Sequence, residues 1–496
     1  MKLALLLHFY QPHNQQSDIL NRIVNESYLP ITRGLLARPH ARLTVNISGA
    51  LLELLTQNGY TEVIGNLKTL LDRGQIEITG SAKYHAFLPL LPESEIDRQI
   101  VLNNESNSKY LGTSYSPKGF FTPELAVSQN ILQIVKLKGF DWIGVPQVSK
   151  VGGDPDCAHL YKEKETGLNV FFRNKRVSSL ILSGVCRDAE DFIKETTDIH
   201  SQAYWFCVMD AETFGHHRVG HEKFLFDVLD NKFFEPVTVS DLLKENLPAQ
   251  EVELRPSTWT NEEQDFWIDR EHIVATSARS FILWQDPENP IHTLQWKLAI
   301  LAMQSVQDFP NKTSENYLKA RALLDMAISS DQFWWASAKP WWSLEMIEQG
   351  AYGLKAVLIT LEPDSLSAKE AEVLYRAILD QAFDWQRSGY IRKKHLENSG
   401  TYMKEPFNTR APAEWYNQII LEFEDEMTRA ATKREFEKAI KWRDALIKLK
   451  NGTDIYDVLH VVDELWAARN IPQLKPFVEH KPEELSKFSR DYFRPL

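Results

Sequence analysis

The sequence predicts an α/β fold, a closed or nearly closed barrel of parallel strands, followed by an all-helical region. Short apolar segments alternate with longer segments of helical periodicity through the first half of the chain, as is typical of a parallel sheet with helices outside it. About seven such units are present, which favours a barrel. From about residue 290 the apolar residues follow helical spacing alone. We therefore expect a barrel over residues 1–290 and a helical domain over residues 291–496.

The individual elements follow from the same periodicity. Strands are predicted at residues 2–7, 42–47, 75–79, 117–121, 140–145, 204–209 and 236–239. Helices are predicted between them at residues 49–58, 61–73, 93–111, 128–138, 188–196 and 221–230. The segment 147–176, with two adjacent glycines and mixed charge, fits neither pattern and is expected to be a loop or a hairpin inserted into the barrel.

Composition limits the partners of the chain. The net charge of -12 and the pI near 5.7 argue against nucleic acid or an anionic membrane, because both attract basic surfaces. Three scattered cysteines, Cys157, Cys186 and Cys207, indicate core thiols in a reducing compartment. The first residues, MKLALLLHFYQPH, begin like a short signal peptide but lack a small-residue cleavage site, which favours a buried strand. We therefore expect a cytoplasmic protein with no membrane segment.

Two carboxylates follow apolar strands at the end where barrel chemistry occurs. Asp210 comes directly after YWFCVM, and Glu124 follows GFF with Pro123 fixing the turn. Paired carboxylates from separate strands are what glycoside hydrolysis requires, one as nucleophile or base and the other as proton donor. A third acid, Glu77, lies inside another predicted strand. The pair Glu124 and Asp210 is therefore the candidate catalytic centre.

Structural roles for the same residues stand beside this hypothesis. Asp210 could cap the following helical turn, and Glu124 could form a surface ion pair or lie in solvent. His216, His217 and His221 could bind a metal, although no familiar ligand spacing accompanies them. The tryptophan pairs in FWWASAKPWW are by default packing residues. Because adjacent residues on a helix face different directions, one ring of each pair could instead line a cleft.

Five blocks give the chain a resemblance to glycoside hydrolase family 57. They are HFYQPH, GQIEITGS, GFFTPELAVS, MDAETFGHH and FWWASAKPWW, in that order, spread over residues 8–342. The resemblance implies an incomplete (β/α)7 barrel followed by helices, and a retaining enzyme acting on α-glucans without a cofactor or metal. It also implies that Glu124 is the nucleophile and Asp210 the general acid/base, with Asp210 holding the proton near neutral pH. The expected substrate-binding residues are His8, Gln11, His13, Glu77, Glu212, His217, Trp259 and Trp335.

The sequence leaves the finer activity open. In the first block the family has a histidine directly before Gln-Pro, where this chain has Tyr10. Hydrolysis and sugar transfer use the same two acids, and the linkage, α-1,4 or α-1,6, is not determined by the blocks. A non-catalytic carbohydrate-binding protein and a metal-dependent deacetylase-type hydrolase on a similar barrel are the alternatives. The retaining mechanism requires the two acids at a gap of roughly 5 to 6 Å.

Overall fold

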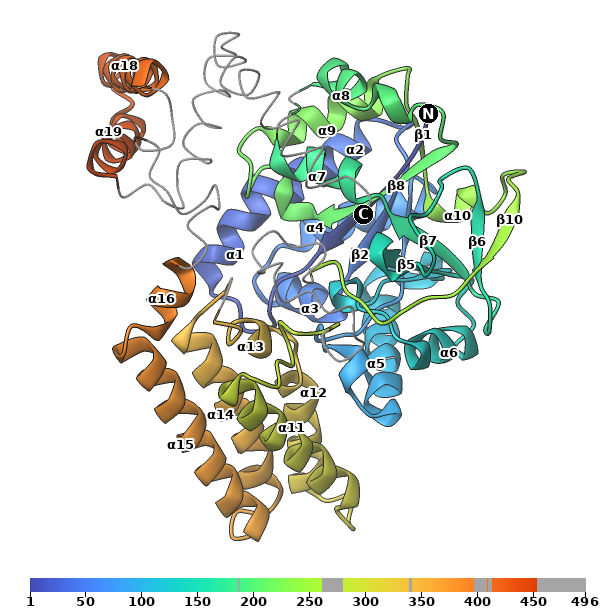
Figure 1. Ribbon diagram of the computed structural model, residues 1–496, viewed down its shortest axis with the longest axis vertical. Helices are drawn as coiled ribbons and strands as arrows, with labels where there is room; N and C mark the ends of the chain where they lie inside the picture. The colour runs from blue at the N-terminus through green and yellow to red at the C-terminus, as the bar shows by residue number, and fades with distance from the viewer. Residues whose placement is uncertain are drawn as a thin grey trace.

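The structure is a barrel of parallel strands with a bundle of helices attached to it (Figure 1). It is a computed structural model, which describes residues 1–452 except 185, 187, 261–279, 339–340, 397–407 and 409–412. No helix among these residues is long and apolar enough to cross a membrane. The three cysteines are buried and unpaired by disulfides, as expected for core thiols.

The strands form two sheets with the orders β3-β2-β1-β8 and β10-β6-β7-β5-β4, and β9 pairs with the start of β1. All pairs are parallel except that between β6 and β7. The bounds are β1 Lys2–Phe9, β2 Leu43–Ile47, β3 Ile76–Ile78, β4 Gly119–Phe120, β5 Trp142–Pro146, β6 Leu160–Glu163, β7 Asn169–Arg173, β8 Tyr204–Asp210, β9 Glu235–Val237 and β10 Ala249–Val252.

Backbone contacts join the two sheets at both edges. Gly80, just after β3, forms a parallel bridge with Phe120 of β4. At the other edge, the amide of Asn174, just after β7, donates a hydrogen bond of 2.7 Å to the carbonyl of Phe206 in β8. Gly80 has no room for a side chain, because a Cβ there would lie 2.5 Å from the ring of Phe140. The strands β1, β2, β3, β4, β5, β7 and β8 therefore make the incomplete TIM-like barrel that the sequence predicts.

Two strand predictions need correction, and a third strand was not predicted. The segment 147–176 does contain a hairpin, β6 and β7, but β7 is itself a barrel strand that pairs with β5. The strand predicted at residues 236–239 is the short β9, which pairs only with residues 2–4 at the start of β1. The strand β10, which pairs with β6, was not predicted. The hairpin is harder to recognise because its residues mix charged and apolar side chains.

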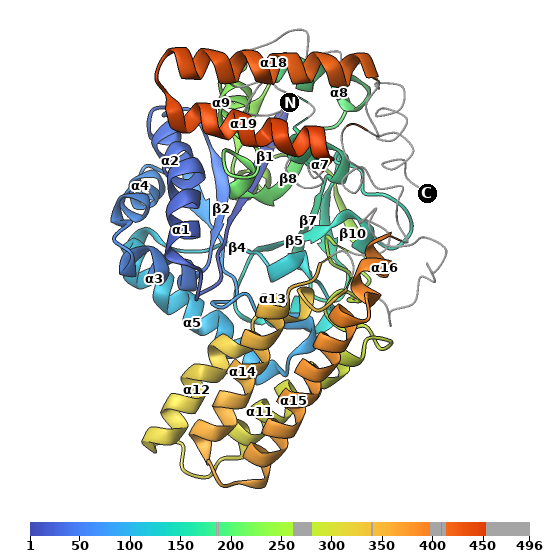
Figure 2. The same ribbon diagram turned by 90° about the vertical axis from the view of Figure 1, so that its left-hand side faces the viewer.

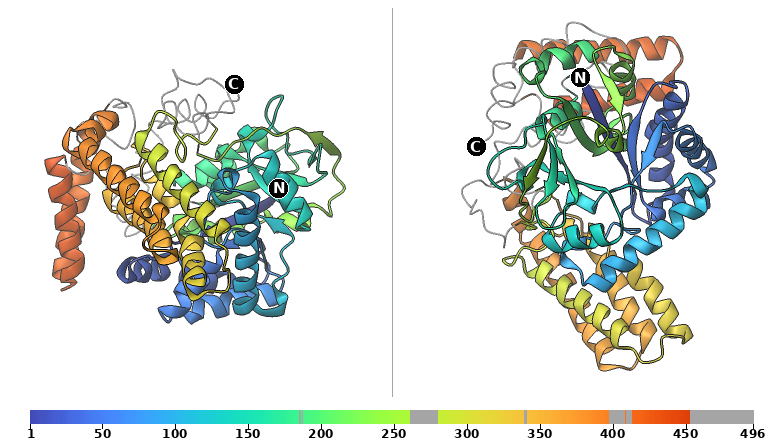
Figure 3. Two further views of the ribbon diagram at one scale, coloured as in Figure 1. Left: turned by 90° about the horizontal axis from the view of Figure 1, so that it is seen from below. Right: turned by 90° about the vertical axis from the view of Figure 1, so that its right-hand side faces the viewer.

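Helices surround the barrel strands (Figure 3). The six predicted helices are all present, and two of them, those at residues 49–57 and 189–195, begin at the side-chain caps Ser48 and Asp188. The helices and helical turns are α1 Ser17–Ile23, the π-helix Val24–Tyr28, α2 Leu29–Leu36, α3 Gly49–Gln57, α4 Thr61–Asp72, α5 Glu93–Leu111, α6 Gln129–Leu137, α7 Lys175–Ser183, α8 Ala189–Glu195, α9 His221–Asp230 and α10 Val239–Leu242.

The second half of the described chain is helical from Pro290 onward. Its helices are α11 Pro290–Asp308, α12 Glu315–Ala327, α13 Asp331–Trp334, α14 Leu344–Leu361, α15 Leu366–Arg387, α16 Tyr390–Leu396, α18 Ala413–Thr432 and α19 Phe436–Asn451. The helices α11 to α15 form a bundle beside the barrel, and α13 lies where the two meet (Figure 2). One hydrophobic core runs from the barrel into this bundle, whereas α18 and α19 share a small core of their own.

A buried ion-pair network fixes the bundle against the barrel. Arg321 of α12 donates two hydrogen bonds of 2.7 Å to the carboxylate of Glu95 in α5, and a third, of 3.0 Å, to Asp325. Arg98 of α5 holds the same Asp325 at 2.6 and 2.7 Å. Paired, hydrogen-bonded charges of this kind have strict geometry. They set the position of α12 and hence of α13, which follows it at the barrel mouth.

Candidate active site

Asp210 and Glu124 lie at the carboxyl ends of two barrel strands. Asp210 is the last residue of β8, where it pairs in register with His8 of β1. Glu124 lies in a 3₁₀ turn, Pro123–Leu125, shortly after β4. The two are close enough for the charge of Asp210 to raise the pKa of Glu124. The structure therefore brings both predicted catalytic residues to one end of the barrel, where such folds carry out their chemistry.

The backbone at Glu124 adopts a conformation that residues with side chains rarely take. Its φ is 62°, and that of Leu125 is 46°, both in the left-handed region. The hydroxyl of Thr258 and the amide of Trp259 donate to the carbonyl of Glu124 at 2.6 and 3.2 Å. Such strain persists only where surrounding contacts impose it, and it concentrates at functional sites. The turn is thus held in a shape that fixes the direction of the Glu124 side chain.

Burial dominates the chemistry of Glu124. The residue is 3% exposed, and burial raises its pKa to about 8, with smaller contributions from the charges of Asp210 and Asp331. The indole Nε1 of Trp259 donates a hydrogen bond of 2.8 Å to Glu124 Oε2, which favours the ionised form. The ring of Trp259 is thus a direct partner of the candidate nucleophile. Trp267, eight residues further along the chain, lies outside the described residues.

Asp210 is not a helix cap. It precedes the 3₁₀ turn Ala211–Thr213, but its side chain accepts no capping hydrogen bond. Burial raises the pKa of Asp210 to about 6, and the guanidinium of Arg173 opposes this increase. Arg173 ends β7, and its Nε donates to the carbonyl of Val208 at 2.9 Å. A carboxyl group whose pKa lies close to neutral pH can both give and take a proton. Asp210 therefore suits proton transfer better than helix capping.

Burial raises the pKa of both acids, that of Glu124 to about 8 and that of Asp210 to about 6. The charge of Asp210 adds to the increase at Glu124, and the charge of Arg173 opposes it at Asp210. The expectation from the resemblance, that the shared proton lies on Asp210, stays a prediction. Near neutral pH the pair therefore holds about one proton, and the two acids titrate as a coupled unit.

Aromatic rings stack between the acids and the helical bundle. The ring of His8 lies 4.6 Å from that of Phe121 and 5.2 Å from that of His85, measured between centroids. Tyr10 stacks on His85 at 3.9 Å. The Nδ1 of His8 lies 2.7 Å from Asn46 Oδ1, and burial lowers the pKa of His8 to about 4. These imidazoles are neutral and held rigidly at the barrel mouth.

The bundle contributes an acid that sequence reasoning missed. Asp331, the first residue of α13, accepts a hydrogen bond of 2.6 Å from the hydroxyl of Tyr10. Burial raises its pKa to about 6, and its charge raises the pKa of Glu124. The signal available in the sequence was its position immediately before the block QFWWASAKPWW. Tyr10, the departure in the first block, thus ties the barrel to α13, together with His85, which bonds to Ser330 at the start of that helix.

Gln11 and Glu212 bind each other beside the acid pair. The Nε2 of Gln11 donates to Glu212 Oε1 at 2.9 Å, and the hydroxyl of Tyr28 donates to the same oxygen. Glu212 is 4% exposed, and burial, reinforced by the charge of Asp210, raises its pKa to about 8. Two predicted substrate-binding residues therefore lie together next to Asp210.

Replacing Glu212 with Gln is expected to stabilise the fold at high pH only. A carboxyl group whose pKa is raised on folding binds more protons when folded, so the folded state loses stability as pH rises from about 4.5 to about 8. A glutamine can still accept from Tyr28 and Gln11 but has no charge to bury. At about 1.4 kcal/mol per pKa unit the gain above pH 8 is up to about 3 to 5 kcal/mol. Thermal unfolding at pH 5 and pH 9 measures it.

The matched control is Glu62→Gln, because Arg33 lowers the pKa of this exposed carboxyl group. Loss of the Glu62 charge should not stabilise the protein at pH 9. Identical pH dependence of unfolding for Glu212→Gln and the unchanged chain would contradict the expectation.

The remaining predicted substrate-binding residues lie in different surroundings. Trp335 is half-buried, with its ring 5.6 Å from that of Trp341. His217 is exposed, and its amide donates to the carbonyl of Glu212 at 2.7 Å. His13 faces the ring of Tyr84 edge-on and lines a pocket on the bundle side.

Glu77 has structural partners. Its carboxylate accepts from Thr44 Oγ1 at 2.8 Å and from the backbone amide of Ser240 at 3.0 Å. Thr44 pairs with Leu6 of β1, two residues before His8, so Glu77 lies deeper in the barrel than the acid pair. These contacts fix the first turn of α10 to the sheet. We therefore leave Glu77 out of the proposed binding site.

The histidines near Asp210 have partners of their own. His216 Nδ1 lies 2.6 Å from Glu26 Oε2, and His221 is stacked between Phe214 and Phe224. Within the described residues, no group of three His, Cys, Asp or Glu side chains is arranged to hold a metal ion.

Comparisons with known proteins find family matches in both halves of the chain. The family model described as glycosyl hydrolase family 57 matches residues 6–255, and one described as the UvrB/uvrC motif matches residues 417–452, in α18 and α19. Alpha-amylase 1 of Dictyoglomus thermophilum is 27% identical over 144 residues, which are 29% of this chain and 20% of that protein. The 4-alpha-glucanotransferase of Thermococcus litoralis is 27% identical over 139 residues, with coverage of 28% and 20%. The match thus spans about a fifth of the length of these relatives.

The fold has solved counterparts. A GH57-type branching enzyme of Pyrococcus horikoshii superposes with a TM-score of 0.55 at 16% identity, covering 77% of this chain and 94% of that structure. At this identity the likeness shows the barrel and helical region in common, and it leaves the substrate undetermined.

Proposed function

Because the chain belongs to glycosyl hydrolase family 57, we propose that it cleaves or transfers α-glucan chains by double displacement with retention of configuration. The observation that carries the proposal is the pair of enclosed carboxylates, Glu124 and Asp210, from separate strands and within electrostatic reach of each other. A second line of support is that relatives named alpha-amylase and 4-alpha-glucanotransferase match the same chain.

In the first step the Glu124 carboxylate attacks the anomeric carbon while Asp210 gives its proton to the glycosidic oxygen. The leaving chain departs with that proton, and a covalent glycosyl–Glu124 ester remains. The single proton of the pair must then lie on Asp210 when the sugar is bound. The hydrogen bond from Trp259 to Glu124 Oε2 favours this distribution, because it stabilises the ionised glutamate.

In the second step ionised Asp210 takes a proton from the incoming hydroxyl group, which attacks the anomeric carbon and releases Glu124. Water as the acceptor gives hydrolysis, and a sugar hydroxyl gives transfer. The electric field of Arg173, which lowers the pKa of Asp210, helps Asp210 to return to the ionised form. The same residues therefore serve both outcomes, and the acceptor is chosen by the rest of the cleft.

The sugar is held by polar and aromatic residues around the pair. We assign substrate contacts to His8, Gln11, Glu212 and Trp259, which lie beside the acids. The half-buried Trp335 and the exposed His217 would contact more distant sugars of the chain. Neutral imidazoles and amides suit this role, because they exchange hydrogen bonds with hydroxyl groups without burying a charge.

Product analysis tests the proposal. Incubation with maltoheptaose should give shorter oligosaccharides, accompanied by longer ones if transfer occurs. Proton NMR during the first minutes should show the α-anomer of the new reducing end before mutarotation. A β-anomer formed first would exclude double displacement, and binding of maltoheptaose without any cleavage would favour the carbohydrate-binding alternative.

A further inference from the structure

Arg173 is a buried cation without an ion pair. It ends the barrel strand β7, and 7% of the residue is exposed. Burial lowers its pKa only to about 10, so the guanidinium group stays charged at neutral pH. No carboxylate of the described residues forms an ion pair with it. Because charged side chains are seldom buried without a partner, an unpaired cation at the mouth of a barrel indicates a ligand-binding role.

The two terminal nitrogens of Arg173, Nη1 and Nη2, are accessible to a ligand. The Nε donates to the carbonyl of Val208, whereas neither terminal nitrogen donates to a described residue. Neither nitrogen is among the polar atoms that the described part of the chain encloses without a partner. A guanidinium group carries five N–H donors in a planar fork. Four of these donors are thus held in place by the Nε bond and can reach the oxygen atoms of a ligand.

Arg173 lies beside both members of the catalytic pair. Its guanidinium carbon is 5.9 Å from the centre of the Trp259 ring, within the range of a cation–π contact. The same ring donates its N–H to Glu124. Arg173 also lowers the pKa of Asp210 by its charge, although the two groups form no ion pair. The guanidinium group and the Asp210 carboxyl group are therefore close together but not in direct contact.

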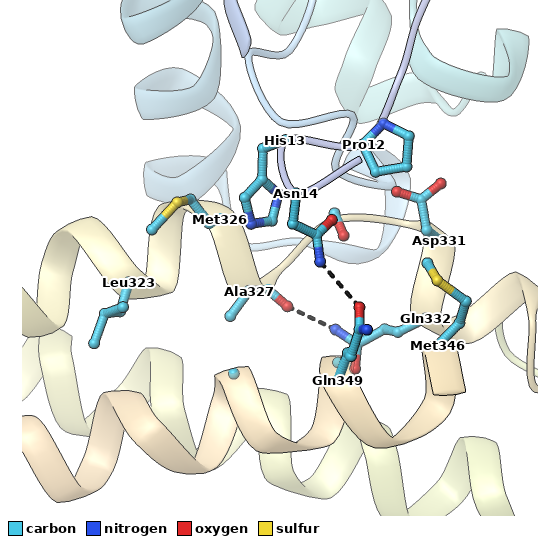
Figure 4. Close-up of a pocket in the computed structure, with 13 residues that line it drawn as sticks. Pro12, His13, Asn14, Leu323, Met326, Ala327, Asp331, Gln332, Met346 and Gln349 are labelled. Atoms are coloured by element: carbon cyan, nitrogen blue, oxygen red, sulfur yellow. Dashed lines mark hydrogen bonds between the residues drawn. The ribbon is translucent and has the colours of Figure 1, made fainter. Parts of the chain in front are cut away.

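Asp210 is accessible in the same way as Arg173. The other acids at the barrel mouth, Glu124, Glu212 and Asp331, each accept a side-chain hydrogen bond. Asp331 also lines a pocket between the loop after β1 and the bundle (Figure 4). The carboxyl group of the half-buried Asp210 accepts no hydrogen bond from the described residues, and its oxygens are not enclosed. A donor group and an acceptor group, both accessible, thus meet at the site of proton transfer.

We propose that Arg173 binds the substrate directly, with Nη1 and Nη2 donating hydrogen bonds to hydroxyl groups of the sugar that lies against Trp259 and Asp210. The proposal rests on the proposed function and adds a cation to its binding residues. A hydroxyl group both accepts and donates, so one sugar oxygen can accept from Arg173 and donate to ionised Asp210. A neutral sugar suits this position better than an anionic group, which would be bound beside four carboxyl groups.

Arg173→Met tests the direct contact, because methionine fills similar space but has no donor. We measure the dissociation constant for maltoheptaose by calorimetry, with Glu124→Gln as the background to prevent turnover. It should rise about tenfold to hundredfold, as expected for the loss of a hydrogen bond from a charged donor. An effect through Asp210 alone would shift the pH dependence of cleavage and leave this affinity unchanged. The variant should fold, since it loses one hydrogen bond and no ion pair among the described residues.

Arg173→Lys separates the donor fork from the charge. A lysine keeps a positive charge beside Asp210, so the pH dependence of cleavage should stay close to that of the unaltered chain. Its ammonium group does not reproduce the planar fork, so the dissociation constant for maltoheptaose should still be about tenfold higher. Should Arg173→Met fail to fold, Arg173→Lys alone carries the test.

The matched control is Arg38→Met, at an arginine with similar contacts that lies before β2, at the opposite end of the barrel. Its Nε donates to Asp230 at 2.9 Å, and its guanidinium carbon is 4.3 Å from the centre of the Phe226 ring. This change should leave the affinity as it was. Unchanged affinity in the folded Arg173 variants would overturn the direct contact and leave the proposed function intact. Absence of maltoheptaose binding in the background protein, together with absence of cleavage by the unaltered chain, would overturn both proposals.

Discussion

Glu124→Gln is expected to lower the rate of maltoheptaose cleavage by a factor on the order of 10⁴ or more, as loss of a covalent nucleophile does. The amide is nearly the same size as the carboxyl group and can still accept the hydrogen bond from Trp259. It cannot form the glycosyl ester, so the first step has no partner for the anomeric carbon. Initial rates of reducing-sugar release measure the effect.

The variant also separates chemistry from folding. Because burial raises the pKa of Glu124 to about 8, removing its charge should not destabilise the protein at neutral pH. Glu163→Gln is a suitable control, since Glu163 is a 2% exposed carboxylate in the β6–β7 hairpin whose contacts are local. That variant should keep its activity. Undiminished cleavage by Glu124→Gln would remove Glu124 from the mechanism.

The sequence was sufficient to place the two acids at one end of the fold. Strand and helix periodicity alone predicts parallel strands, and parallel strands align their carboxyl ends. Asp210 and Glu124 each follow a short apolar run, so their proximity needed no long-range information. The contact between Trp259 and Glu124 was partly foreseeable, because Trp259 is among the residues expected to bind substrate.

The barrel strand β7 was missed because its signal is ambiguous. The segment LYKEKETGLNVFFR has a turn at Thr166 and Gly167 flanked by apolar residues, which is a hairpin pattern. Nothing local indicates that the second strand of this hairpin pairs with β5 inside the barrel. Arg173, at the end of this strand, lowers the pKa of Asp210 by its charge. It was missed together with the strand.

The residues that the helical bundle adds to the candidate active site could not be predicted from the sequence, for a different reason. Tyr10 and Asp331 are separated by 321 positions. Their contact depends on how α12 packs on α5 through Arg321 and Glu95. The raised pKa values of Glu124 and Asp210 depend likewise on burial by remote segments. Local patterns carry no information about either.

Asp210→Ala is expected to slow cleavage of maltoheptaose by about 10² to 10⁴, the range that general acid–base catalysis contributes. The loss should be much smaller in the first step for a substrate such as 4-nitrophenyl α-maltoside, whose leaving group departs without a proton. The glycosyl ester on Glu124 then accumulates, because no base activates the acceptor. Mass spectrometry of the denatured protein should show the mass of the bound sugar, and a burst of nitrophenol should precede a slow steady state.

Azide distinguishes the roles of the two acids by stereochemistry, because this anion attacks without needing a general base. In Asp210→Ala it should attack the ester on Glu124 from the opposite face and give an α-glycosyl azide with restored turnover. In Glu124→Ala it should occupy the place of the missing carboxylate and give a β-glycosyl azide. The assignment requires these opposite products, since the nucleophile and the acid/base act on opposite faces of the sugar ring. The reverse pair of anomers would exchange the roles of Glu124 and Asp210.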